Sequence, residues 1–566
     1  MLKHREHKLP VTLLVALMLV LSACGSEAAE PSGELPFEPG AYPAAGPAEC
    51  PSDEAGNALP GFKRITSMNE STVVFELCSP DAAFLNKLAM ISFNIQDSGY
   101  LATHGADGSI MREPNGTGPF ALASWQDGTQ IVLSRFDDYW GEKANVKSAV
   151  IQFQNDSSAR LVMLQAGTVD GTPVIGSSDE AAILADANLK LLRRPAITMA
   201  YIAMTNRAEP FNDVRVRRAI ALGVDRQRIV DLFYPEGSST AHSFTPCEIT
   251  FGCAGPEWYE PDPAAAQALL SEAGFPDGFE TTIIVRSDVT SHTPYPMEIA
   301  QDVQAQLKLI GIEATIEVLE RTTWTDRLIS GENIGIGIGG GWVADYADPT
   351  NYLDFFFRAD QGGSARFGEP YADVSALLVE AAQELDLKRR EGIYAEANRL
   401  IKENVPVIPT VQTGSAIVYR ADVEGANSSP LELENLAALK PGTRDTFVWV
   451  IPTEPGSLYC AAMGGQDLLR VCNQIGESLY GFELGSTTLK PLLSTGCTAS
   501  SDGLTWTCAL RENVRFHNGS LFDATDVRDT FAVMWDCAHP WRLKGGVFDD
   551  ITLFTGVLNE AACSQE

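Results

Sequence analysis

Apolar and polar residues along the chain follow two different periodicities. Three segments repeat apolar residues at helical spacing, and Gly274, Gly311 and an Asn-Val-Pro sequence at 404–406 follow them as stop signals. The expected helices are 264–273, 299–310 and 393–401. Shorter β-rich stretches predict strands at 72–77, 130–133, 312–318 and 504–510. The mixture predicts an α/β fold, and the sequence shows no internal repeat of the kind that marks solenoids or tandem duplications.

The N-terminus has the layout of an export signal. Three basic residues precede an apolar run at 11–21, which is too short to span a bilayer as a stable helix and ends in Leu-Ser-Ala-Cys-Gly at 21–25. This ending resembles a bacterial lipobox, so we expect a signal peptide at 1–23 and lipidation of Cys24; an ordinary cleaved signal is the alternative. Residues 24–49 read as a flexible tether. The protein would then be exported and lipid-anchored to the outer face of the cell membrane (periplasmic if the organism has an outer membrane).

Composition and charge narrow the class of partner. The chain has 566 residues, 45% of them hydrophobic, which suffices for two or three packed domains. Its net charge is −33, and removal of 1–23, with three basic groups and one acidic group, leaves −35. Such a charge disfavours nucleic acid and direct adsorption to anionic lipid, so the acyl chain would be the only membrane link.

Eleven cysteines suggest disulfides, because lipidation of Cys24 leaves an even number in an exported chain. Spacing favours Cys247–Cys253, Cys460–Cys472 and Cys497–Cys508, and the cysteines that remain would form Cys50–Cys78 and Cys537–Cys563. The chain has no CxxC pair and no histidines at metal-binding helical spacing in the mature part, so we expect no metal site and no cofactor.

Two local patterns could carry chemistry. The segment 335–340 satisfies the dinucleotide pattern GxGxxG, but the residues after it read as a strand end and a turn rather than the helix that would hold a pyrophosphate.

A cluster of aromatic and acidic residues follows within eleven positions: Trp342, Asp345, Tyr346, Asp348 and Tyr352. An aromatic wall with a carboxylate suits a ligand with an ammonium group and an apolar part. A capped turn that packs its aromatics into the core explains these residues equally well. No hydrolase or phosphate-binding motif is present, so we do not expect an enzyme.

Four separated segments together resemble family 5 of the bacterial extracellular solute-binding proteins, the dipeptide- and oligopeptide-binding group. They are NGTGPF at 115–120 with Trp125 and DYWG at 138–141; PFNDVRVRRAI at 210–220 with Asp225-Arg226; the stretch 264–279 ending in GFPDGF; and LRENVRFHNG at 510–519 with DATDV at 523–527. In the usual family the last segment precedes the strand that resembles 71–75. Each segment occurs once here, so the chain resembles a circularly permuted branch joined near 441–445. Two mis-joined gene fragments would instead leave duplicated or missing segments, and we see neither.

The resemblance implies an α/β, two-lobed periplasmic-binding-protein fold of type II with an extra domain. The implied divisions are 50–118 plus 488–566 for the extra domain, 119–206 plus 412–487 for the first lobe, and 207–411 for the second lobe. The lobes would close over a ligand in the cleft between them.

The resemblance also implies a site and partners. Asp345 matches the aspartate that binds a peptide's α-ammonium, Trp342 and Tyr346 would line the cleft, and Glu454 and Tyr459 are further candidates. The protein would be a monomer that delivers a peptide to ABC transporter permease subunits. Alternatives are a nickel chelate, haem, an opine or an oligosaccharide as ligand, a sensor that feeds a receptor, or, from another class, a secreted hydrolase.

Overall fold

The computed structural model describes residues 37, 39–52, 58–173, 175–176, 179–330, 334–359, 367, 371–554 and 556–563. The expected signal peptide, Cys24 and the first part of the expected tether lie outside these residues. Within the described part of the chain, no helix is both long enough and apolar enough to cross a membrane.

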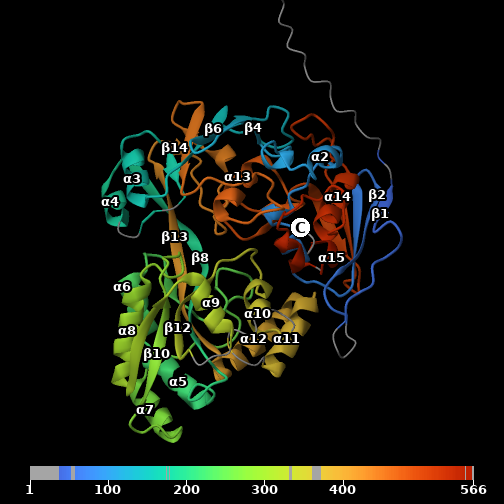
Figure 1. Cartoon of the computed structure of the whole chain (residues 1–566). Coiled ribbons are helices and arrows are strands. Elements are labelled where there is room, and N and C mark those ends of the chain that lie inside the picture. Colours follow the sequence, from blue (N-terminus) through green and yellow to red (C-terminus); the bar gives the residue numbers. More distant parts are fainter. Residues whose placement is uncertain are drawn as a thin grey trace, which may run out of the picture.

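The largest sheet of the described residues is a mixed sheet, with parallel and antiparallel strands. Among the described residues it contains 11 strands, ten of them in one path and β9 (Ser239–Thr240) paired with β13. The order along the path is β11 (Ile312–Leu319), β10 (Phe279–Arg286), β12 (Ile336–Trp342), β8 (Leu189–Met204), β13 (Val407–Arg420), β7 (Gly171–Thr172), β16 (Thr446–Ile451), β6 (Ser148–Phe153), β5 (Gln130–Arg135) and β4 (Phe120–Gln126). The long antiparallel strands β8 and β13 run through both halves of the molecule and join them (Figure 1).

The half drawn in green and yellow in Figure 1, which we call the second lobe, is built on β10, β11 and β12. Its buried apolar cluster runs from Ile197 to Val411. Its helices are α5 (Val214–Gly223), α6 (Arg226–Phe233), α7 (Pro263–Glu272), α8 (Pro296–Leu309), α9 (Arg321–Ile329), α10 (Thr350–Phe357), α11 (Ala372–Gln383) and α12 (Leu387–Asn404). Asp262 caps α7 by accepting a hydrogen bond from the backbone N–H of Ala265, as its position before Pro263 suggests.

The other half of the sheet, which we call the first lobe, carries the strands from β7 to β4. It also contains α3 (Ser157–Gln165), α4 (Glu180–Ala185), α13 (Gln466–Ile475), the 3-10 turn η5 (Leu436–Ala438) and the strand pair β14 (Val423–Glu424) with β15 (Lys440–Pro441). Strand β16, which follows the expected junction at 441–445, pairs in parallel with β6. Residues from both sides of that junction therefore share one core.

A separate five-stranded sheet in the described chain forms a third part, the extra domain. Its order is β1 (Gly40–Tyr42), β2 (Phe62–Asn69), β3 (Thr72–Leu77), β20 (Thr505–Leu510) and β19 (Ser494–Ala499). C-terminal strand β20 thus pairs with N-terminal strand β3, and the red and blue segments lie together in Figure 1. The same part holds α1 (Phe84–Lys87), η1 (Ile91–Phe93), α2 (Ser98–His104), η2 (Ser109–Met111), β17 (Tyr480–Phe482), β18 (Leu489–Pro491), α14 (Ala524–Trp535), η6 (Asp549–Leu553) and α15 (Glu560–Cys563).

The segments predicted from periodicity correspond to elements of the structure. The expected helices are α7, α8 and α12, and the expected strands are β3, β5, β11 and β20. The ten described cysteines are disulfide-bonded in the five expected pairs. Spacing indicated Cys247–Cys253, Cys460–Cys472 and Cys497–Cys508, and the remaining cysteines form Cys50–Cys78 and Cys537–Cys563. Each bond closes a short loop within one part of the fold, which restricts the unfolded chain.

The second lobe touches the extra domain directly. The backbone N–H of Ala82 donates to the carbonyl of Ala382 at 2.8 Å. Tyr346, in the turn that follows the second-lobe strand β12, is buried in the apolar cluster of the extra domain. The two parts therefore meet beside the turn that carries Asp345.

Candidate functional site

The glycine-rich segment is strand β12, and its glycines allow two rings to pack against the backbone. A Cβ on Gly340 would lie 2.3 Å from the ring of Tyr201, and a Cβ on Gly341 would lie 2.2 Å from the ring of His292. Both distances are far below van der Waals contact. Helix α10 begins only at Thr350, eight residues after the strand ends at Trp342. The glycines therefore serve ring packing and do not form a phosphate-binding turn.

A cavity of about 610 Å³ opens where β12 ends, between this strand, the loop after β10 and helix α9. This volume is in the range of roughly 300–1,000 Å³ that small-molecule sites occupy. The aromatic side chains that line it are Tyr201, Trp324 and Trp342. The titratable side chains that line it are Arg286, His292, Arg321, Asp326 and Asp345. The wall therefore offers apolar surface and both signs of charge.

Asn351 on α10 positions the cavity's central carboxylate and one of its aromatic walls. Its side-chain N–H donates to Asp345 Oδ2 at 2.9 Å. Its Oδ1 accepts from the backbone N–H of Asp345 and from Trp342 Nε1, both at 3.0 Å. The indole of Trp342 also stacks on Phe355, with ring centroids 4.7 Å apart. Because Asn351 is buried and packed, it holds Asp345 and Trp342 in fixed orientations.

The surroundings of Asp345 favour a cation beside it. Its side chain is exposed to solvent in the cavity, but the protein atoms around it reduce its hydration and raise its pKa to about 6. The hydrogen bond from Asn351 opposes this shift, and the charge of Asp550 adds to it. A bound ammonium group would stabilise the ionised carboxylate.

The other titratable groups of the cavity differ in whether they can offer a charge to a ligand. Arg286 donates from Nε to Asp288 Oδ1 at 2.6 Å, so its charge is already partnered. Burial, together with the charge of Arg286, lowers the pKa of His292 to about 4, which keeps its imidazole neutral at physiological pH. Arg321, at the start of α9, is exposed and faces the same cavity.

Of the five candidate ligand-binding residues, the structure brings two together at this cavity, Asp345 and Trp342. Tyr346 is buried in the extra-domain cluster, with its hydroxyl 3.1 Å from Thr350 Oγ1. Tyr459 is buried in the same cluster and meets Phe548 edge to face at 5.9 Å.

Glu454, the fifth candidate, lies in the first lobe. Its carboxylate accepts from Trp125 Nε1 at 2.7 Å and from the backbone N–H of Gly128 at 2.8 Å. These bonds tie it to the hairpin of β4 and β5.

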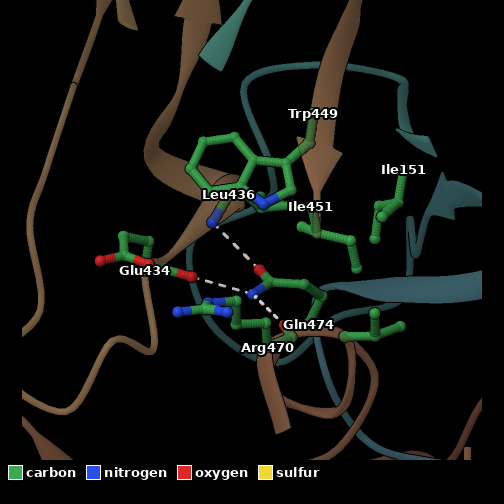
Figure 2. Close-up of a pocket in the computed structure, with 8 residues that line it drawn as sticks. Ile151, Glu434, Leu436, Trp449, Ile451, Arg470 and Gln474 are labelled. Atoms are coloured by element: carbon green, nitrogen blue, oxygen red, sulfur yellow. Dashed lines mark hydrogen bonds between the residues drawn. The ribbon is translucent and has the colours of Figure 1, made fainter. Parts of the chain in front are cut away.

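A second hollow, between α13 and β16, is a feature of core packing. Figure 2 shows Gln474 at its centre, donating to the carbonyls of Glu434 (2.9 Å) and Arg470 (3.0 Å) and accepting from the N–H of Leu436 (3.0 Å). Its volume is about 10 Å³, which is room for a single water molecule. A solute larger than a water molecule does not fit there and must bind elsewhere.

In the described chain, one group of side chains lies close enough together to bind a metal ion. The ligand atoms of His242, Cys247 and Cys253 lie within 4.8 Å of one another. The two cysteines are bonded to each other, so they have no thiolates with which to hold a metal.

Sequence reasoning found Asp345 and Trp342 but missed Asn351, His292, Arg286 and Tyr201. Asn351 lies six residues after Asp345, within the candidate cluster at 342–352. The local sequence could therefore have suggested its amide as a group that hydrogen-bonds Asp345. The other three reach the cavity from β8, from the end of β10 and from the loop after it, and no local pattern marks them.

Comparisons with known proteins agree with this architecture. The family model described as "Bacterial extracellular solute-binding proteins, family 5 Middle" matches residues 41–364 and 488–553. Heme-binding protein A of Haemophilus influenzae is 28% identical over 65% of this chain and 68% of that protein. Di/tripeptide-binding protein 1 of Pseudomonas aeruginosa is 29% identical over 67% of this chain and 71% of that protein.

Two solved structures are similar in fold and sequence. HbpA2 from Haemophilus parasuis superposes with a TM-score of 0.62 at 28% identity, covering 68% of this chain and 76% of that one. The periplasmic binding protein DppA from Helicobacter pylori, in complex with the peptide STSA, gives 0.52 at 26% identity, covering 68% and 72%. With the family match extending over more than half of its residues, the chain belongs to family 5 of the bacterial extracellular solute-binding proteins.

Proposed function

We propose that this protein captures peptides or peptide-like solutes outside the cell and delivers them to the permease of an ABC importer. Asp345 carries the proposal, because it places an ionisable carboxylate with a raised pKa in a cavity lined by Trp342, Tyr201 and Trp324. A peptide's ammonium would pair with Asp345 while its apolar parts contact the indoles. Arg321 could then pair with a carboxylate of the same ligand. Names of relatives that refer to di- and tripeptides support this ligand class.

The small molecule that the protein carries tests this proposal. We expect native mass spectrometry of protein purified without denaturation to show bound mass in the range of short peptides, released on unfolding. Fragmentation of the released molecules should give peptide ions. Incubation of the protein with defined peptides should leave them intact, whereas cleavage would favour the secreted hydrolase.

A haem or another metal chelate is the second candidate, and His292 is the observation that favours it. Its imidazole lines the cavity and is kept neutral, the form in which histidine binds metals. The name of one relative, Heme-binding protein A, points the same way. Absorption spectra of the purified protein separate the candidates, since haem gives a Soret band that a peptide lacks. An opine, a nickel chelate or an oligosaccharide would be identified by its mass.

We further propose that the chain is a circular permutation with the domain divisions given above, changed at two points. Strand β1, within the expected tether 24–49, pairs with β2 and so belongs to the extra domain, as does β17, which the expected divisions placed in the first lobe. Pairing of β20 with β3 and of β16 with β6 supports this, because C-terminal segments complete sheets begun by N-terminal ones. The family match in two separate blocks is compatible with it. Lipidation of Cys24, export to the outer face of the cell membrane and a monomeric state belong to the same proposal.

A further inference from the structure

The turn after strand β12 presents two neighbouring side chains to two different parts of the molecule. Asp345 lines the ligand cavity, whereas Tyr346 lies in the buried apolar cluster of the extra domain and is 3% exposed. One peptide bond joins the two residues. Withdrawal of the Tyr346 ring from that cluster would therefore displace the backbone from which the Asp345 carboxylate projects.

The hydroxyl of Tyr346 is tied to the second lobe. It lies 3.1 Å from Thr350 Oγ1. Because Thr350 donates its own hydroxyl hydrogen to Asp348 Oδ1 at 2.8 Å, the Tyr346 hydroxyl is the donor to Thr350. Asp348 in turn forms a buried ion pair with Arg390 of α12 at 2.7 Å. The hydroxyl therefore belongs to a polar network of the second lobe, while the ring packs in the extra domain.

Other contacts hold the same two parts together. The backbone N–H of Ala82, in the extra domain, donates to the carbonyl of Ala382 on α11 at 2.8 Å. A Cβ on Gly503 would lie 2.9 Å from Cβ of Pro80 and 3.1 Å from Cδ1 of Leu385. The extra-domain residues Pro80 and Gly503 thus meet a leucine of the second lobe. The boundary is packed beyond the ring of Tyr346, and the amide of Ala82 reports whether it is formed.

The Asp345 carboxylate is oriented from two directions. Within the second lobe, the side-chain N–H of Asn351 donates to its Oδ2 at 2.9 Å. From the extra domain, packing of the Tyr346 ring fixes the backbone on the other side of the turn. The described residues that line the cavity come from the second lobe and from β8, so the extra domain acts on the ligand site through this turn rather than by direct contact.

We propose that Tyr346 is a positioning residue for the ligand's ammonium group. Packing of its ring in the extra domain holds Asp345 where it binds the ammonium, and a bound ammonium in turn holds the second lobe against the extra domain. The coupling is reciprocal, because two events that favour one conformation stabilise each other by the same free energy. The inference rests on the proposed function and assigns the extra domain a role in retaining the ligand.

Two variants that each delete a buried ring of the extra-domain cluster separate positioning from stability. Tyr346→Ala deletes the ring beside Asp345. Phe93→Ala deletes a ring of η1 that is 1% exposed and packs on Phe531 and Phe554, with no backbone connection to the turn. Tyr346→Phe keeps the ring and removes only the hydroxyl. The probes are the tripeptide that wild-type protein retains most strongly from a defined library and its N-acetylated form, and titration calorimetry gives Kd for each.

We expect Tyr346→Ala to weaken binding of the free-amine tripeptide about 10-fold or more, because the carboxylate that pairs with its ammonium is misplaced. Binding of the acetylated tripeptide should not change. Tyr346→Phe and Phe93→Ala should bind the free-amine tripeptide within about threefold of wild type, although Phe93→Ala lowers the unfolding midpoint by a similar amount to Tyr346→Ala. Wild-type affinity should fall between pH 7 and pH 5, and the affinity of Tyr346→Ala should change less over that range.

Hydrogen exchange tests the reverse direction of the coupling. Saturating tripeptide should slow exchange of the Ala82 amide in wild type, because its hydrogen bond to Ala382 crosses the boundary. The amide of Leu77 is the control, since its hydrogen bond to Leu504 at 2.8 Å lies within the extra domain. Its exchange rate should be the same with and without ligand. In Tyr346→Ala the ligand should slow neither amide.

Three results would overturn the inference while leaving the proposed function intact. They are wild-type affinity in Tyr346→Ala, an equal loss for free and acetylated tripeptides, and ligand-independent exchange of the Ala82 amide, in each case with Asp345→Asn impaired in binding. Failure of the wild type to bind any tripeptide would overturn the proposed function and this inference together. If Tyr346→Ala does not fold, Tyr346→Leu provides the same comparison with part of the apolar volume retained.

Discussion

The ring of His292 packs directly on strand β12 because Gly341 has no side chain, and replacing this glycine tests that reasoning. In Gly341→Ala the new Cβ would lie 2.2 Å from Cγ, 2.3 Å from Cδ2 and 2.5 Å from Cβ of His292. The ring would have to move by more than about 1 Å to restore contact distance. His292 is buried, so the strain should cost about 1–3 kcal/mol, as overpacking of a core does. The displaced ring would also move into the ligand cavity.

Gly337→Ala is the matched control in the same strand. Its Cβ would lie 3.4 Å from the Cβ of Ala203, which is ordinary contact. We expect thermal unfolding to show a midpoint several degrees lower for Gly341→Ala than for wild type, and a midpoint near wild type for Gly337→Ala. Calorimetry should show ligand binding lost only in Gly341→Ala. Equal stability and equal affinity in the two variants would refute the claim that the ring of His292 rests on Gly341.

Three further predictions concern the charge, the anchor and the connectivity. The carboxyl group of Asp345 has a pKa of about 6, so below that pH it must lose a proton before it can pair with a cationic ligand. The affinity of wild type for such a ligand should therefore fall about tenfold between pH 7 and pH 5. The affinity of Asp345→Asn should stay constant over the same range. Cys24→Ala should move the protein from the membrane to the soluble exported fraction, and continued detergent-dependent extraction would contradict the lipid anchor. Moving 446–566 in front of residue 50 through a short linker should give a folded protein with unchanged Kd, because the core contacts stay in place; unfolded protein at every linker length would contradict the permutation.

Local sequence patterns were sufficient to predict the elements whose stabilising contacts are local. Helix α7 begins where Asp262 and Pro263 supply a cap and a fixed φ, and Gly274 follows it with φ of +99°, which favours glycine. The residues after the glycines predict a strand end and a turn, and β12 does end at Trp342, with no helix before α10 at Thr350. The pairing of β20 with β3 links residues more than 400 positions apart, and only the resemblance to a known family indicated it.

The aromatic cluster after β12 shows why local patterns could not define the site. Two interpretations were open, a ligand wall and a packed turn, and the structure divides the residues between them. Trp342 lines the cavity, whereas Tyr352 is fully buried and donates to the carbonyl of Ile197 at 2.5 Å. Asp345 faces the cavity, whereas Asp348 is buried against Arg390 at 2.7 Å. Which side each residue faces depends on partners from distant elements, and the local sequence does not contain them.

Calorimetry with two proteins and two peptides tests the central claim most directly. The proteins are wild type and Asp345→Ala, and the peptides are a short peptide with a free amino terminus and its N-acetylated form. A buried ammonium that loses its counter-charge should cost about 2–4 kcal/mol, which is roughly 30- to 1,000-fold in Kd. The account predicts this loss for the free peptide alone, with the acetylated peptide binding weakly to both proteins. Equal losses for both peptides, or no loss for either, would contradict the assignment of Asp345 as the ligand's anchor.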